Sequence, residues 1–399
     1  MVGDQSLRGD VLGPQRISRR KNDGDSSEVD SEINDADIIW TVDMYNELGV
    51  FPHNLAVSSP VIHGDVLYLN SGNGVDEGHL EIPAPRAASF LGINKNTGEV
   101  VFEDNSPEDA ILHGQWSSPC VGVVNGKAQV VFAGGNGWMY SFDTETHELL
   151  WKFDLNPKEY LYELGGAGTR CYIIGTPVFY DNSVFLAIGQ DPEHGEGVGH
   201  LWRVDATKSG DISAEIGDVG APGEPNPNSG VIWQYGGIDE ERELIYRRTM
   251  STVAIHGGLD FAADLSGFLH CVDLKTGQRY WQHDLMAELW GSPLYLDGHI
   301  FLGDADGRLN IFDASMEYAL KRQELEKQIA EKRKIMKESE DDDEVRRTRA
   351  EIKAMIATVA PQVRESPHSS AIFTTPTVAS GVMYISDRMK LYSIQITKQ

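Results

Sequence analysis

Two glycine-rich segments of the chain bring carboxylates and imidazoles close together. The first runs from Ser71 to Ser89 and the second from Gln190 to Gly199. Oxygen and nitrogen donors of these kinds can hold a divalent cation, and the carboxylates favour calcium. None of the spacings is a recognised ligand signature, and solvated loop residues explain the pattern as well. The candidate ligands are Asp76, Glu77, His79, Asp191, Glu193, His194, Glu196 and His200.

A second group of polar and aromatic residues lies just ahead of short apolar runs. Imidazole, amide, indole and guanidinium groups in such a position are suited to a small-molecule or peptide pocket. Trp116 stands before Ser-Pro, as Trp290 does, so packing between structural repeats is its alternative role. The candidates for ligand binding are His53, Asn54, His113, Gln115, Trp116 and Arg170.

The segment Ser251 to Trp281 indicates which elements position these residues. Four short β-rich runs alternate with glycine-bearing turns, which predicts a four-stranded antiparallel meander. Such a sheet is apolar on both faces and needs copies of itself on either side. Copies are marked by a Ser-Pro or Thr-Pro pair that begins at Ser59, Ser118, Thr176, Ser292 and Thr375, and by Ser251-Thr252 without Pro. A base period of about 40 residues with four strands per unit predicts an all-β propeller.

The pattern predicts about six such sheets, or blades. Their starts are expected near Val57, Trp116, Tyr172, Ser251, Gly291 and Phe373. Antiparallel geometry sends the loops between second and third strands, and those between blades, to one face of the disc. The longest loops fall in these two classes, so we expect any binding site on that face.

The two ends of the chain suggest how the ring closes. Residues 1–37 are polar and charged and read as a disordered or peripheral arm, which leaves 38–399 as the propeller. Ile38 to Asp43 carries Trp40 and reads as a fourth strand without its first three, whereas the C-terminus offers three strands. Pairing of the two would close six blades. The alternative is a shortened eight-bladed ring that remains an open arc.

The stretch 315–357 has no Gly or Pro and is rich in Glu, Lys, Arg and Ala. Its apolar residues lie near helical spacing on either side of an acidic run, which predicts an antiparallel helical hairpin. The hairpin interrupts the turn between the third and fourth strands of the fifth blade, so it should project from the opposite face. It is either a solvated spacer or a docking arm for a partner or a second copy.

Composition excludes several classes of function. The 399 residues carry a net charge of −27, which disfavours binding to nucleic acid or to anionic lipid through a basic face. No stretch reaches the ~20 apolar residues of a membrane span. Residues 1–37 show no apolar signal-peptide core, which keeps a cytoplasmic location open. The three cysteines, Cys120, Cys171 and Cys271, lie in different blades and form no metal-binding pair.

The turn D-x-x-T-G-x-x-x-W, formed by Asp273, Thr276, Gly277 and Trp281, resembles the tryptophan-docking motif of the PQQ-like β-propeller repeat family. That family includes quinoprotein alcohol dehydrogenases and the propeller lipoprotein of the outer-membrane assembly machine. The resemblance extends over Ile38 to Ile396, and several loop segments resemble exported bacterial propellers of unknown function. It implies a periplasmic or otherwise exported protein. It also implies structural docking roles for Trp40, Asp143, Trp151, Asp273, Gly277 and Trp281.

Catalytic members of the family hold PQQ between a tryptophan and a vicinal cysteine pair, beside a calcium ion. This sequence has no Cys-Cys pair, nucleophile elbow, phosphate loop or H-E-x-x-H motif. We therefore expect no cofactor and assign no catalytic residue. The favoured function is a non-catalytic scaffold that binds a protein or peptide partner in the cell envelope through its loop-rich face. The alternative is a PQQ- and calcium-dependent oxidoreductase, or a hydrolytic enzyme, with its site at the channel mouth among His53, His113, Arg170, Glu193 and His194.

Overall fold

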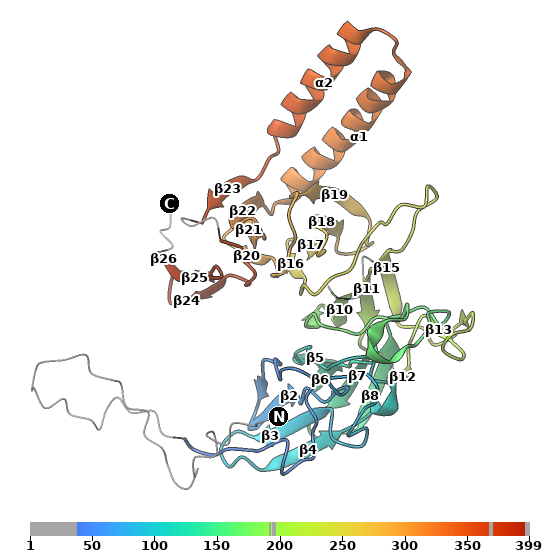
Figure 1. The fold of residues 1–399 in the computed structure, drawn as a ribbon, viewed down its shortest axis with the longest axis vertical. Coiled ribbons are helices and arrows are strands. Elements are labelled where there is room, and N and C mark those ends of the chain that lie inside the picture. The colour runs from blue at the N-terminus through green and yellow to red at the C-terminus, as the bar shows by residue number, and fades with distance from the viewer. Residues whose placement is uncertain (1–37, 191–192, 194–196, 367–369, 396–399) are drawn as a thin grey trace, which may run out of the picture.

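Six antiparallel sheets follow one another along an arc in the computed structural model, which describes residues 38–190, 193, 197–366 and 370–395 (Figure 1). Their first strands begin within a few residues of the predicted starts, which confirms the propeller repeat. The first sheet comprises β1 (Val61–His63), β2 (Val66–Asn70), β3 (Phe90–Asn94) and β4 (Val100–Asp104). The second comprises β5 (Cys120–Val124), β6 (Lys127–Ala133), β7 (Trp138–Asp143) and β8 (Leu149–Asp154).

The third sheet contains an insertion before its last strand. It is built from β9 (Val178–Tyr180), β10 (Ser183–Ile188), β11 (His200–Asp205) and β15 (Val231–Gly236). Between its last two strands, β12 (Gly210–Asp211) pairs in parallel with β8 of the second sheet. A small separate hairpin follows, made of β13 (Glu215–Ile216) and β14 (Glu224–Pro225).

The last three sheets end with an incomplete one. The fourth comprises β16 (Ala254–His256), β17 (Leu259–Ala263), β18 (Phe268–Asp273) and β19 (Arg279–Asp284). The fifth comprises β20 (Leu294–Leu296), β21 (His299–Gly303), β22 (Arg308–Asp313) and β23 (Gln362–Glu365). The sixth has three strands, β24 (Thr377–Ala379), β25 (Val382–Ser386) and β26 (Leu391–Gln395).

The recurring Ser or Thr before proline links neighbouring sheets. The Ser59 amide donates to the Ser118 hydroxyl at 2.9 Å, and the Ser292 amide donates to Thr375 Oγ1 at 2.8 Å. Thr252 lies in the middle of a similar chain, because its hydroxyl accepts from the amide of Thr176 while its own amide donates to Ser292. The Ser or Thr of this motif therefore ties the first strand of the first sheet to that of the second, and joins the first strands of the third to sixth sheets in series.

Two tryptophans, one on β15 and one in the segment ahead of the first sheet, each dock on the turn of the sheet that follows. The indole of Trp233, on β15, covers Gly277, where an added Cβ would lie 2.7 Å from the ring; Trp40 covers Gly98 in the same way, at 2.8 Å. In both cases Nε1 donates to the carbonyl three residues before the glycine. The acceptors are Leu274, at 2.9 Å, and Lys95, at 2.8 Å.

Two further tryptophans, both fully buried, use a variation of this contact. Trp151 Nε1 donates to Gln129, whose side-chain amide donates to the Ala206 carbonyl in the following sheet. Trp281 stacks on Phe312 of the fifth sheet with ring centroids 5.7 Å apart, and the Arg322 guanidinium lies 4.3 Å from the centre of its ring. In the fifth sheet the docking turn is replaced by a helix, and that helix supplies the arginine.

The N-terminal segment corrects one expectation. Ile38 to Asp43 forms no strand, and β26 pairs only with β25 among the described residues. Trp40 instead fixes this segment on the first sheet, so the segment does not close the ring, and the first and last sheets stand apart in Figure 1. The predicted arm at residues 1–37 lies outside the described residues.

The predicted hairpin consists of α1 (Met316–Glu338) and α2 (Asp342–Ala357), capped at their N-termini by the side chains of Ser315 and Asp341. It leaves the fifth sheet between β22 and β23 and extends beyond the sheets (Figure 1). Its first helix lies along β19, whose open edge it covers: Glu326 accepts from the Gln282 amide at 3.2 Å. Neither helix combines the length and hydrophobicity that a membrane crossing requires.

The tryptophan contacts make a first prediction about stability. Replacing the buried Trp281 by alanine should lower the free energy of unfolding by about 3–5 kcal/mol, because it leaves a cavity between two sheets and unseats α1. Leu80→Ala serves as the control, since the Leu80 side chain is 80% exposed. Chemical denaturation of both variants measures the difference. Equal loss in the two would contradict the docking role.

A second prediction separates docking from backbone strain. Gly277 and Gly298 both have left-handed backbones, with φ of +72° and +80°, but only Gly277 has a neighbour within 4 Å of an added Cβ. Gly298→Ala should cost about 1–2 kcal/mol for the left-handed backbone alone. Gly277→Ala should cost about 1–3 kcal/mol more, because the methyl group displaces Trp233. Thermal and denaturant unfolding of the pair tests this order.

Candidate metal centre

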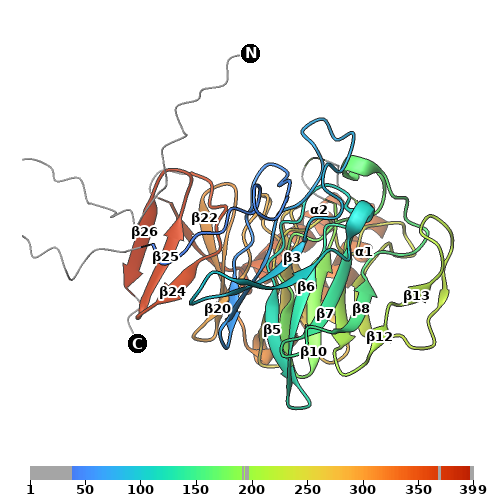
Figure 2. The same ribbon diagram turned by 90° about the horizontal axis from the view of Figure 1, so that it is seen from below.

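Three loops from two sheets converge at a cluster of histidines. His53 comes from the segment ahead of β1, His79 from the loop between β2 and β3, and His113 from the connection between β4 and β5. Figure 2 shows the loops of the first three sheets gathered along one side of the strands. The prediction that loops of these two classes share a face thus holds for this part of the chain.

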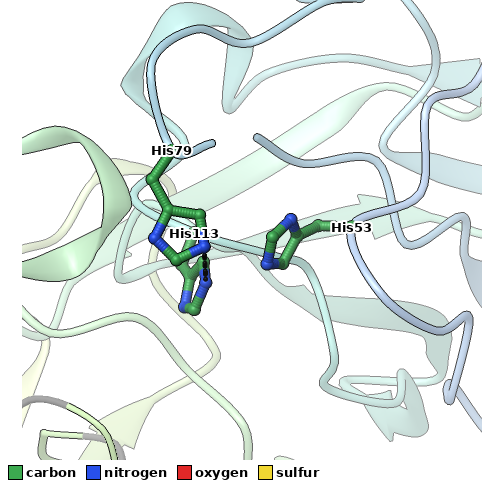
Figure 3. Close-up of side chains that lie close together, drawn as sticks. All are labelled: His53, His79 and His113. Atoms are coloured by element: carbon green, nitrogen blue, oxygen red, sulfur yellow. Dashed lines mark hydrogen bonds between the residues drawn. The ribbon is translucent and has the colours of Figure 1, made fainter. Parts of the chain in front are cut away.

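The three imidazoles face one another (Figure 3). Each offers one ring nitrogen, and these three nitrogens all lie within 4.8 Å of one another. The closest pair is Nε2 of His79 and Nε2 of His113, at 3.1 Å. His53 and His113 are 3% and 1% exposed, whereas His79 is partly exposed. Solvent therefore reaches the cluster only at His79.

Contacts on the far side of the rings orient two of the histidines. His53 Nδ1 lies 2.9 Å from the Val75 carbonyl, which can only accept, so Nδ1 carries the proton and Nε2 keeps its lone pair. That Nε2 is buried without a hydrogen-bond partner among the described residues. His113 Nδ1 lies 3.0 Å from the Tyr172 hydroxyl. Backbone carbonyls and hydroxyls hold metal-binding histidines in the same manner.

The backbone around the cluster is fitted closely to it. An added Cβ at Gly74 would lie 2.6 Å from the His113 carbonyl and 2.8 Å from His53 Cβ. Gly165, at φ +82°, approaches the side chain of His79 equally closely. His79 itself has a left-handed backbone, with φ of 54°. Such strained and crowded positions persist where the surrounding structure holds them, and they are enriched at functional sites.

Asp76 shapes the loop that carries His79. Its carboxylate accepts from the amides of Gly78, Leu80 and Glu81. These hydrogen bonds lower the pKa of the Asp76 carboxyl, the Glu81 amide having the largest effect. Asp76 therefore accepts hydrogen bonds from amides on both sides of His79, and these hydrogen bonds fix the backbone that carries the His79 side chain.

The electrostatics of the cluster suit a cation. Burial lowers the pKa of His53 from its ordinary value, and the neighbouring His113 and His79 lower it further. The charge of Glu193 raises the pKa of His53, so this carboxylate from the loop between β10 and β11 lies within electrostatic range. The lowered pKa favours the neutral form of the His53 imidazole, which is the form that binds a metal ion.

Three imidazole nitrogens favour zinc or a similar transition ion over calcium, which prefers oxygen ligands. In a tetrahedral site with Zn–N distances of about 2.0–2.1 Å, the nitrogens stand about 3.3 Å apart. The pair from His79 and His113, at 3.1 Å, already matches this separation, and because all three nitrogens lie within 4.8 Å of one another, no other pair needs to close by more than about 1.5 Å. A tetrahedral ion takes a fourth ligand, and the carboxylate whose charge acts on His53 is that of Glu193.

The other described residues that are predicted to form a site do not contribute a ring nitrogen to the cluster. Trp116 borders the cluster, with its ring 5.0 Å from that of His113, and its Nε1 donates to the His53 carbonyl. Gln115 is buried and donates to the Ser89 hydroxyl, whereas Asn54 and Glu77 are exposed. The other predicted ligands Asp191, His194 and Glu196 lie outside the described residues.

His200 and Arg170 belong to different surroundings. His200, on β11, lies between the Gln234 amide at 2.7 Å and the Tyr160 hydroxyl at 3.3 Å. Burial lowers the pKa of His200 to about 4, which keeps the ring neutral inside the third sheet. Arg170 pairs with Asp154 at 2.7 Å and does not reach the histidine cluster within hydrogen-bonding distance.

Sequence reasoning placed the three histidines in two separate groups. His79 is predicted as a metal ligand and His53 and His113 as pocket residues, whereas Tyr172 is predicted only as the start of the third blade. The signal that could have joined them was present: three histidines in three loops predicted to share one face.

Comparison with known proteins bears on the fold. A family model described as outer membrane protein assembly factor BamB matches residues 191–316. No curated protein sequence matches the chain. BamB from Moraxella catarrhalis superposes with a TM-score of 0.47 at 13% identity over 84% of this chain and 70% of that protein.

Two further structures are similar at the same low level. The quinohemoprotein alcohol dehydrogenase ADHIIG from Pseudomonas putida HK5 gives a TM-score of 0.36 at 14% identity, over 66% of this chain and 41% of that one. The C-terminal WD40 domain of Sif2 gives 0.43 at 10% identity, over 83% and 66%. The family model covers residues 191–316 alone, and within and beyond that segment the repeated four-stranded antiparallel sheets are those of a β-propeller.

Proposed function

We propose that the chain is a non-catalytic scaffold of the cell envelope that binds a protein or peptide partner through its loop-rich face, with a zinc-class metal ion organising that face. The observation that carries the proposal is the convergence of His53, His79 and His113 from three separate loops. An ion bound there adds a cross-link to loops that backbone hydrogen bonds already hold together, such as those from the His53 amide to the Gly72 carbonyl and from the Gly74 amide to the Phe51 carbonyl. The matched family is described as an outer membrane assembly factor, which supports an envelope role.

Such a cross-link would strengthen partner binding by ordering the loops before the partner arrives. Long loops lose conformational freedom when a partner binds, and that loss weakens the complex. A metal ion fixed to loops of two sheets removes part of the freedom beforehand. The backbone hydrogen bond from the Val75 amide to the His113 carbonyl, at 2.9 Å, already joins two of these loops and sets their spacing.

Metal binding is the first expected result. Chelator-treated protein titrated with Zn²⁺ should bind one ion per chain, and Co²⁺ should give the visible absorption of a tetrahedral site. His53→Ala and His113→Ala should each weaken zinc binding by at least about 100-fold, since each removes a ligand. Binding should also weaken at acid pH, because protonated imidazoles cannot coordinate.

His63→Ala is the matched control, because His63 lies exposed on β1 away from the cluster. It should bind zinc like the unaltered chain. Circular dichroism of each variant shows whether it remains folded. Zinc binding that is absent from the unaltered chain, or unaffected in His53→Ala, would contradict the metal site.

Partner binding is tested on immobilised protein with cell-envelope extract. The unaltered chain should retain a partner in zinc and release it on chelation. A His53→Ala, His113→Ala double variant should fail to retain it, whereas a chain lacking 315–357 should still do so. A partner lost only on removal of the hairpin would assign docking to α1 and α2 instead of the loop-rich face.

A further inference from the structure

A second site lies in a cavity that shares no residue with the three-histidine cluster. The cavity has a volume of about 290 Å³ and lies between the second sheet and the loops that flank it. Its walls are formed by Ala110, Asn136, Trp138, Tyr162, Arg170 and Val219, with Asp109 alongside. This volume is at the lower end of the range for small-molecule pockets.

A buried carboxylate and two buried cations lie at this cavity, and one of the cations, Arg170, lines it. The Asp154 carboxylate, 2% exposed, accepts from Arg170 Nη2 at 2.7 Å and from Lys158 Nζ at 2.9 Å. Both cations are almost completely buried, at 2% and 4% exposure. Within ion-pair distance one carboxylate therefore meets two cations, and the Glu215 carboxylate lies alongside, where it accepts from the Lys158 amide at 3.0 Å. A buried charge is stable only when it is paired, so the donors that these cations leave unused decide whether the group can take a ligand.

The two cations are not satisfied to the same degree. The Lys158 ammonium lies 4.4 Å from the centre of the Trp138 ring, which offsets part of its charge. Arg170 spends Nη2 on Asp154 and on the Asn136 carbonyl, but its Nη1 is buried without a hydrogen-bond partner among the described residues. Arg170 lines the cavity, and an unused donor on its guanidinium is the feature that a ligand would complete.

We infer that this cavity binds a compact organic monocarboxylate, with Arg170 Nη1 as the donor to its carboxylate. Arginine and carboxylate match in geometry as well as in charge. Ala110, Val219 and the aromatic rings provide apolar walls for the rest of the molecule. The Asp109 carboxylate beside the cavity repels anions, and it disfavours a multiply charged anion such as phosphate more than a monocarboxylate.

Calorimetric titration with benzoate tests the inference, with benzamide as the neutral analogue of the same shape and inorganic phosphate as the multiply charged anion. The unaltered chain should bind benzoate, and should bind both other compounds at least tenfold more weakly. Arg170→Lys should lose at least tenfold in benzoate affinity, because an ammonium cannot reproduce the fork of donors.

Arg170 also holds Asp154, so its replacement could disturb folding. Val219→Trp avoids this difficulty: the Val219 side chain is 45% exposed and lines the cavity without contacting the charged group by hydrogen bond or ion pair. The larger ring should fill the cavity and abolish benzoate binding while zinc binding is unchanged. Val123→Trp, at a position 63% exposed on β5 and outside the cavity, should bind benzoate normally.

Three results would overturn the inference: benzoate failing to bind the unaltered chain, binding equally to Val219→Trp, or binding no better than benzamide. In each case the charged group would be a structural ion cluster only. Because zinc binding is measured on the same variants, failure of the carboxylate site is distinguishable from failure of the metal site.

Discussion

The docking of an indole on the next sheet's turn is the contact on which the rest of the molecule depends. A four-stranded sheet with two apolar faces is stable only when both are covered, and each tryptophan fixes the angle and spacing at which the next sheet does so. The contact combines a hydrogen bond to a turn carbonyl with close packing over a glycine, as Trp233 does on Leu274 and Gly277. Hydrophobic clusters between neighbouring sheets then complete the burial.

Where an insertion interrupts a sheet, the tryptophan contact is made in another way. At the fifth sheet the turn after Asp313 opens into α1, and Arg322 and Tyr318 of that helix cover Trp281 in place of a glycine. The hairpin is therefore attached through the docking tryptophan itself, and it covers the edge of β19 as well. At the second sheet Gln129 relays the hydrogen bond of Trp151 to Ala206, which leaves room for the insertion that follows β11.

Because the sheets fix where each loop begins and ends, long loops can carry exact side-chain arrangements. The histidine cluster and the Arg170 cavity both lie where loops of successive sheets meet, and both combine a well-held polar group with an unsatisfied atom: His53 Nε2 in one and Arg170 Nη1 in the other. Buried polar atoms without partners are costly, and others in the described residues, such as those of Asp260 and Arg322, lie away from these loops, so it is the convergence of loops around His53 and Arg170 that distinguishes the two sites.

The sequence alone determined the repeat, the approximate start of each sheet and the helical hairpin, because strand alternation, turn glycines and helical spacing are local properties of the chain. Tertiary structure decided what local patterns do not encode. It placed Trp40 on Lys95 and not beside β26, brought His53 and His113 to His79, and paired Arg170 with Asp154. Those outcomes depend on how far each sheet is rotated from its neighbour and on the path of each loop. Both are set by contacts between residues far apart in the chain.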